Sequence, residues 1–145
     1  MAGEISKTQR RLLVAVNYLS LALLVFMVHG GRARGWSAGV IVAGVLPVAG
    51  VLVATFVGVF WRTGLWHLSH APFEKIDERE AQVMYESLRR SYAVFAVVCV
   101  IILLVNAVAE MGHIPILIAV GLLYLAHTLP AAAAAWSEKR VLADR

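Results

Sequence analysis

Four long stretches of the chain contain no Asp, Glu, Lys or Arg, and they restrict the possible folds more than any other feature. They are residues 12–31, 35–61, 91–109 and 111–137, with lengths of 20, 27, 19 and 27 residues. A helix needs roughly 20 apolar residues to cross about 30 Å of hydrocarbon. Each stretch is therefore long enough to span a membrane once.

The composition agrees with this interpretation. Hydrophobic residues make up 61% of the 145 residues and charged residues 15%, whereas soluble domains have roughly 45–50% and about 25%. The stretches lack the strict alternation of a membrane β-barrel, and within lipid a helix satisfies its own backbone groups. The sequence predicts an all-α integral membrane four-helix bundle, one transmembrane domain over residues 1–145, with spans at 12–31, 36–61, 91–110 and 113–136.

Basic residues are distributed unevenly between the segments outside the spans. The N-terminal tail has three, the first loop two, the second loop five, the third loop none and the C-terminal tail three. Tails and second loop share one side of the membrane, which collects eleven of the thirteen. Because basic loops stay on the cytoplasmic side, we expect both termini in the cytoplasm of a multi-pass protein of the bacterial inner (plasma) membrane. The net charge of +4 is then a feature of topology, and no nucleic-acid partner is expected.

The second loop contains nine charged residues within residues 74–90. Pro72 suits the first turn of a helix, acidic residues come early and basic residues late, as the helix dipole favours. A helical wheel places these residues on one broad face: Phe73, Ile76, Ala81, Val83, Met84, Tyr85, Leu88 and Tyr92. We predict an amphipathic cytoplasmic helical segment over 72–90, which docks its apolar face on the membrane surface or on neighbouring helices.

One part of this segment has a family resemblance. Asp77-Glu78-Arg79-Glu80, followed by Arg89-Arg90-Ser91-Tyr92 at the start of a span, resembles the corresponding segment of small uncharacterised four-span bacterial membrane proteins. The resemblance covers residues 77–92. It implies a membrane location and no particular activity.

Small residues recur four apart in the second span. They are Gly35, Gly39 and Ala43, and then Gly50, Ala54 and Gly58. This spacing lets helix backbones approach closely, so we predict a closely packed second helix. Gly30, Gly31 and Gly35 predict a tight turn between the first two spans.

A few polar residues lie inside the predicted spans, where they are costly and often functional. Asn17, Thr55 and His127 fall about 9–14 Å inside the inner interface at 1.5 Å per residue, and Thr128 follows His127. One interpretation is a layer of interhelical hydrogen bonds. The other is a proton, ion or ligand site centred on His127, beside a kink that Pro130 is expected to produce.

A second polar cluster is predicted at the outer ends of the spans. It comprises His29, Arg32, Arg34, Glu110 and His113. An Arg–Glu pair at the rim is the simplest interpretation. Because imidazoles can serve as axial ligands of haem, His29 and His113 offer an alternative. The sequence identifies no cofactor.

Catalytic and metal-binding motifs are not evident. His67, His70 and Glu74 are residue types that zinc sites use, but Pro72 interrupts the helix that would align them, so no metal site is predicted. The chain has no Ser/His/Asp set, P-loop or nucleotide-binding fingerprint. We therefore expect a protein that is not an enzyme.

Three functional hypotheses follow. The first is a non-catalytic membrane protein that acts through helix association, as a homo-oligomer or as a small subunit of a membrane complex. Its partners would be the lipid bilayer and other membrane protein chains or itself. The second is a small transporter or proton- or ion-conducting protein that uses His127. The third is a redox subunit that holds haem between helices.

Overall fold

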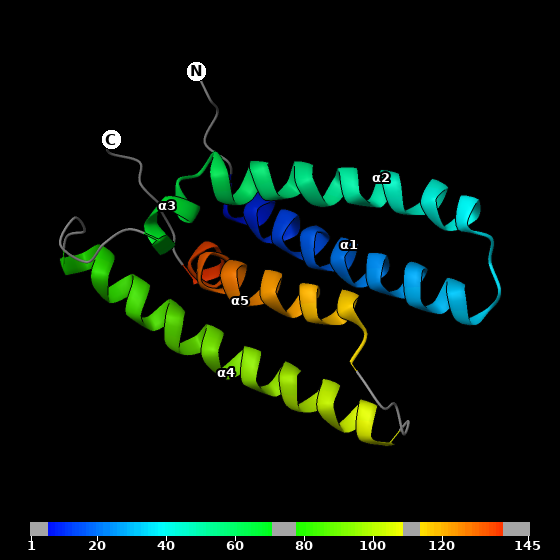
Figure 1. Ribbon diagram of the computed structural model, residues 1–145. Coiled ribbons are helices and arrows are strands. Elements are labelled where there is room, and N and C mark those ends of the chain that lie inside the picture. Colours follow the sequence, from blue (N-terminus) through cyan, green and yellow to red (C-terminus); the bar gives the residue numbers. More distant parts are fainter. Residues whose placement is uncertain (1–5, 71–77, 109–113, 138–145) are drawn as a thin grey trace. The chain divides into compact units, whose positions relative to one another are not determined.

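The computed structural model describes residues 6–70, 78–108 and 114–137, and the regular structure in these ranges is entirely helical (Figure 1). The elements are α1 (Lys7–Ala33), α2 (Ala38–Phe56), the π-helix η1 (Val57–Trp61), α3 (Leu65–His70), α4 (Glu78–Val108) and α5 (Ile116–Ser137). Within the described ranges, four helical segments are long and apolar enough to cross a membrane: Lys7–Ala33, Ala38–Trp61, Ala81–Val108 and Ile116–Trp136. The prediction of an all-α chain with four apolar, membrane-length helices is confirmed.

The helices group into two compact units along the chain. Met1–Thr63 contains α1, α2 and η1, and Gly64–Arg145 contains α3, α4 and α5. Each unit pairs two of the membrane-length helices that follow one another in sequence.

The first helix begins five residues before the predicted span because Ser6 and Gln9 form a capping box. Ser6 Oγ accepts from the Gln9 amide at 3.2 Å, and the Ser6 amide donates to Gln9 Oε1 at 3.0 Å. Two amide groups that the helix leaves without internal partners are thus satisfied. The basic residues ahead of the apolar stretch therefore belong to the helix.

The turn between α1 and α2 is shorter than the turn predicted from the three glycines. Gly30 and Gly31 are helical residues of α1, and among the predicted turn glycines only Gly35, with φ at 72°, has the left-handed conformation that glycine tolerates. The Trp36 amide donates to the Gly31 carbonyl at 3.0 Å. Ser37 then caps α2 by accepting from the Val40 amide at 3.4 Å.

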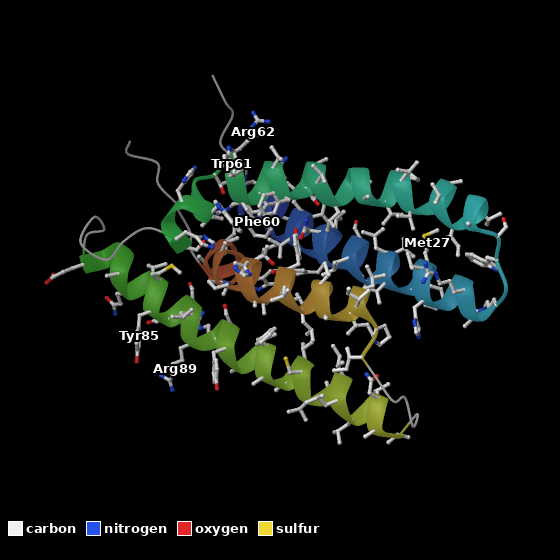
Figure 2. All side chains as sticks on the ribbon, viewed as in Figure 1. Met27, Phe60, Trp61, Arg62, Tyr85 and Arg89 are labelled. Atoms are coloured by element: carbon white, nitrogen blue, oxygen red, sulfur yellow. The ribbon has the colours of Figure 1, made fainter. Side chains whose placement is uncertain are left out.

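α1 and α2 form an antiparallel helical hairpin (Figure 1). Near the turn, buried Gly31 faces Ile41; further along, Met27 lies against Gly44, and Figure 2 shows Met27 directed toward α2. Deeper still, Asn17 meets Thr55. Each step toward the start of α1 is matched by a step toward the end of α2.

The small residues predicted to bring helices together do not form this interface. A Cβ atom added at Gly39, Gly50 or Gly58 would meet no other group within 4 Å, and Ala43 and Ala54 are exposed. At about 100° per residue the positions within α2, from Gly39 to Ala54, lie roughly half a turn around the helix from the residues that face α1. The second helix is therefore closely packed against α1 on one side and open on the other.

Two local features were not predicted from the sequence. The end of the second span is the π-helix η1, where the Arg62 amide donates to the Val57 carbonyl five residues earlier at 2.9 Å. Gly64, with φ at 73°, has the left-handed conformation and precedes the short helix α3. This helix occupies the stretch that was expected to be a simple connection.

In the second unit, α5 packs against both α4 and α3. The buried residues of α4 follow one face, with Met84, Ser87 and Ser91 less than 9% exposed. Ser91 Oγ donates to the Ser87 carbonyl at 2.7 Å, so this buried hydroxyl is satisfied within its own helix. On α5 the buried stretch is rich in alanine and runs from Pro130 to Ala135. Small side chains on both helices permit a close approach.

The residues of the predicted apolar face of the amphipathic segment are partly buried and partly exposed. Met84 is buried, but Tyr85, Leu88 and Tyr92 are 68%, 50% and 75% exposed, and Tyr85 projects from α4 on the same side as Arg89 (Figure 2). Phe73 and Ile76 lie outside the described residues. α4 carries the helix from Glu78 through Ser91 to Val108 without a break, so the charged segment and the third span share one helix.

Candidate functional site

The polar residues predicted inside the spans fall into two local sets. In the first unit, the Asn17 side chain is fully buried and its Nδ2 donates to Thr55 Oγ1 at 2.9 Å and to the Leu52 carbonyl at 3.0 Å. Thr55 Oγ1 also lies 2.8 Å from the Val51 carbonyl. This is a hydrogen-bonded contact between neighbouring helices, of the kind that holds helices together in lipid.

The second set is in the second unit, on α5. Thr128 is buried and its Oγ1 donates to the Tyr124 carbonyl at 2.9 Å. His127 is exposed, and its Nδ1 lies 2.9 Å from the Leu123 carbonyl, one turn earlier. α5 continues through Pro130, which lacks the amide that would bond to the Ala126 carbonyl.

His127 is joined by a histidine that the sequence did not place beside it. The rings of His70 on α3 and His127 on α5 are parallel within 9°, with centroids 6.4 Å apart. On its own helix His70 also packs on Trp66, with ring centroids 4.1 Å apart. Its Nδ1 lies 2.9 Å from the Trp66 carbonyl and 3.0 Å from Ser69 Oγ. Three aromatic rings thus gather where α3 packs on α5.

The outer-end cluster is described only in part. Arg34 folds back on α1: its Nη1 donates to the Gly30 carbonyl at 3.2 Å and its guanidinium lies over the Phe26 ring, 5.3 Å from the centroid. His29 and Arg32 are exposed on the last turns of α1. Glu110 and His113 lie outside the described residues, and so does Glu74 of the His67–His70 motif, so the predicted rim ion pair and the haem alternative remain predictions.

The open side of α2 is the other candidate surface. It carries the small residues Gly39, Ala43, Gly50 and Ala54, with no neighbouring atom inside van der Waals distance of a Cβ at either of these glycines. The flanking large side chains Val42, Leu46 and Val53 are more than half exposed. An apolar helix with a shallow, flat side is suited to contact with another helix.

Among the described residues there is no group of three or more His, Cys, Asp or Glu side chains placed to hold a metal ion. Cys99 is a free, partly exposed thiol on α4. The described part of the chain also contains an ion pair between Glu86 and Arg90, at 3.2 Å on the exposed surface of α4. Such exposed pairs contribute little to stability.

Sequence reasoning missed the pairing of His70 with His127 because the two belong to segments far apart in the chain. It placed His127 by its depth inside the fourth span and considered His70 only together with His67 and Glu74. No pattern in the sequence links them, because α3 has only six residues.

No family model, curated protein or solved structure is similar to this chain. The functional argument therefore depends on the geometry of its own residues.

Proposed function

We propose that this chain is a non-catalytic, multi-pass membrane protein that acts by associating with a second copy of itself through the open side of α2. The observation that carries the proposal is the side of α2 opposite α1, where small residues are exposed and the Cβ positions of Gly39 and Gly50 are open. Helices in lipid gain no hydrophobic free energy by pairing, so they associate where small residues let backbones come close.

A second copy suits this surface better than a partner of different shape. Two identical α2 helices that meet around a two-fold axis would each present the same shallow stripe, and such self-complementary contacts are the commonest in homo-oligomers. The side of α2 is apolar over most of its length, as the hydrocarbon region requires. The charged part of α4 would remain in the cytoplasm and is not required for the contact.

Disulfide cross-linking in membranes tests this proposal. In a Cys99→Ser background, Ala43→Cys should form a disulfide-linked dimer on mild oxidation, because disulfides require Cα atoms about 4.4–6.8 Å apart. Val45→Cys is the matched control: it lies two residues further along α2, at nearly the same depth but about 200° around the helix, away from the open side. We expect several-fold more dimer from Ala43→Cys on a non-reducing gel.

Equal dimer yields at the two positions would indicate random collision and contradict the proposal. No dimer at Ala43→Cys would also contradict it, because lipid or the rest of the same chain would then cover this side. A larger residue gives an independent check. Gly50→Leu should leave the fold intact, since a Cβ there meets nothing within 4 Å. Added to the Ala43→Cys protein, it should abolish the disulfide-linked dimer, so that only monomer is seen on the gel.

The proposed orientation has both termini and the charged start of α4 in the cytoplasm of a bacterial plasma membrane. It is supported by the excess of Lys and Arg on that side. In the Cys99→Ser background, Arg32→Cys should react with a membrane-impermeant maleimide in intact cells. Lys75→Cys and Lys139→Cys should react only after the cells are opened. Labelling of position 75 in intact cells would contradict the proposed orientation and indicate the opposite one.

A further inference from the structure

We propose that His70 and His127 form a binding site for a divalent late transition-metal ion such as Zn²⁺ or Ni²⁺, which links α3 to α5. The two rings come from separate helices that pack against each other, and their planes are parallel within 9° with centroids 6.4 Å apart. The site does not depend on the proposed self-association, because it lies in the second unit and α2 belongs to the first.

The hydrogen bonds of the two rings determine which nitrogen can bind a metal. His70 Nδ1 lies 2.9 Å from the Trp66 carbonyl, and His127 Nδ1 lies 2.9 Å from the Leu123 carbonyl. A carbonyl oxygen only accepts, so in the neutral ring each Nδ1 carries the proton and donates it. Each Nε2 then keeps a lone pair that can coordinate a metal.

This arrangement resembles the surroundings of histidines that bind metals. Such histidines usually donate their second ring nitrogen to a backbone carbonyl or carboxylate, which fixes the tautomer and the ring orientation. Here both histidines have that partner one turn earlier on their own helix. The Trp66 ring lies against that of His70, with centroids 4.1 Å apart and planes tilted by 30°, and further limits the positions that the His70 ring can adopt.

The separation of the rings is compatible with a single bridging ion. Metal–nitrogen bonds of about 2.0–2.1 Å require the two Nε2 atoms to approach within about 4 Å of each other. The ring centroids are 6.4 Å apart, so binding an ion would require the two rings to rotate toward each other about their side-chain bonds. Both histidines are exposed, so no other side chain of the described residues covers the pair.

The ligand set selects the class of ion. Imidazole nitrogen suits Zn²⁺, Ni²⁺ and Cu²⁺, whereas Mg²⁺ and Ca²⁺ prefer oxygen ligands. With no third His, Cys, Asp or Glu grouped with the pair in the described part of the chain, water would complete the coordination. The site would therefore bind reversibly, and the ion would hold α3 against α5.

Isothermal titration of the purified, tag-free protein with Zn²⁺ and Ni²⁺ tests the site. We expect one equivalent per chain. His70→Phe and His127→Phe keep an aromatic ring for stacking but remove the ligand, and each should weaken binding by about tenfold or more, since even partners of metal ligands contribute 10–100-fold. His29→Phe, on an exposed turn of α1, should bind as the wild type does.

Circular dichroism should show that the variants remain folded; where a Phe variant does not, His→Gln at the same position replaces it. Absence of binding to the wild type would overturn the proposal. So would wild-type affinity in either His70→Phe or His127→Phe. Loss in His67→Phe and His70→Phe with full binding in His127→Phe would assign the ion to α3 alone and would equally overturn it.

Discussion

Asn17→Asp is expected to lower the free energy of unfolding by about 3 kcal/mol, the cost of an aspartate within a transmembrane helix. The native amide is fully buried and donates both to Thr55 Oγ1 and to the Leu52 carbonyl, at 2.9 and 3.0 Å. A carboxylate has no hydrogen to donate. To stay ionised, it would bring a charge against a carbonyl oxygen in an apolar region; to avoid that charge, it would have to take up a proton. Both alternatives cost free energy.

Asn17→Leu is the matched control, because leucine has the same branched arrangement of side-chain heavy atoms as asparagine and no charge. It loses the two donated hydrogen bonds, and interhelical bonds of this kind average about 0.6 kcal/mol each, so it should cost roughly 1 kcal/mol. Unfolding by sodium dodecyl sulfate, followed by tryptophan fluorescence, compares the two variants with the wild type. If Asn17→Asp is no less stable than Asn17→Leu, water reaches the Asn17–Thr55 contact and it is not a buried hydrogen bond.

The four membrane-length helices could be predicted because their signal is local and long. A stretch of about 20 residues without charge has few alternatives in a folded chain, and the described helices cover the greater part of each such stretch. The exact ends were less predictable. α1 begins at Lys7 because Ser6 and Gln9 cap it. A capping contact involves only two residues, so it is a weaker signal in the sequence than a long apolar stretch.

The side of each helix that packs against its neighbour could not be predicted from residue spacing alone. The small residues of α2 were predicted to bring helices together, yet α1 packs on the opposite side, through Ile41, Gly44 and Thr55. In a helix that is apolar all round, no polar stripe marks the exposed side. On α4, the buried face includes Ser87 and Ser91, because a small hydroxyl that bonds to its own backbone can be buried as readily as an alanine.

The candidate sites, too, could be predicted only in part from the sequence. Asn17 and Thr55 were singled out because polar groups are costly in lipid, and the structure joins them directly. The contact of His70 with His127 depends on the packing of α3 against α5, and α3 is too short to leave a periodic signal in the sequence. A contact between segments distant in the chain becomes visible only when the fold is known.

Gly31→Val is expected to lower the free energy of unfolding by about 1–3 kcal/mol, as is usual when atoms are forced into a packed site. Gly31 is buried in the last turns of α1. A Cβ atom there would lie 2.9 Å from Cε3 of the Trp36 ring and 3.3 Å from Ile41 Cγ1. The Trp36 backbone is held at this point by the hydrogen bond of its amide to the Gly31 carbonyl, at 3.0 Å, so the ring can withdraw only by rotating about its side-chain bonds. Valine would add two further methyl groups to the same space.

Gly39→Val is the matched control, since it introduces the same side chain near the start of α2, where a Cβ meets nothing within 4 Å. It should unfold close to the wild type when both are measured as monomers in excess detergent, because replacing glycine in a helix tends to favour the helix. The difference between the two variants therefore isolates the contact of Gly31 with Trp36 and Ile41 from the general effect of losing a glycine. Equal stability of the two would mean that Trp36 and Ile41 can move aside without cost, and the tight turn would then not be what positions α2 against α1.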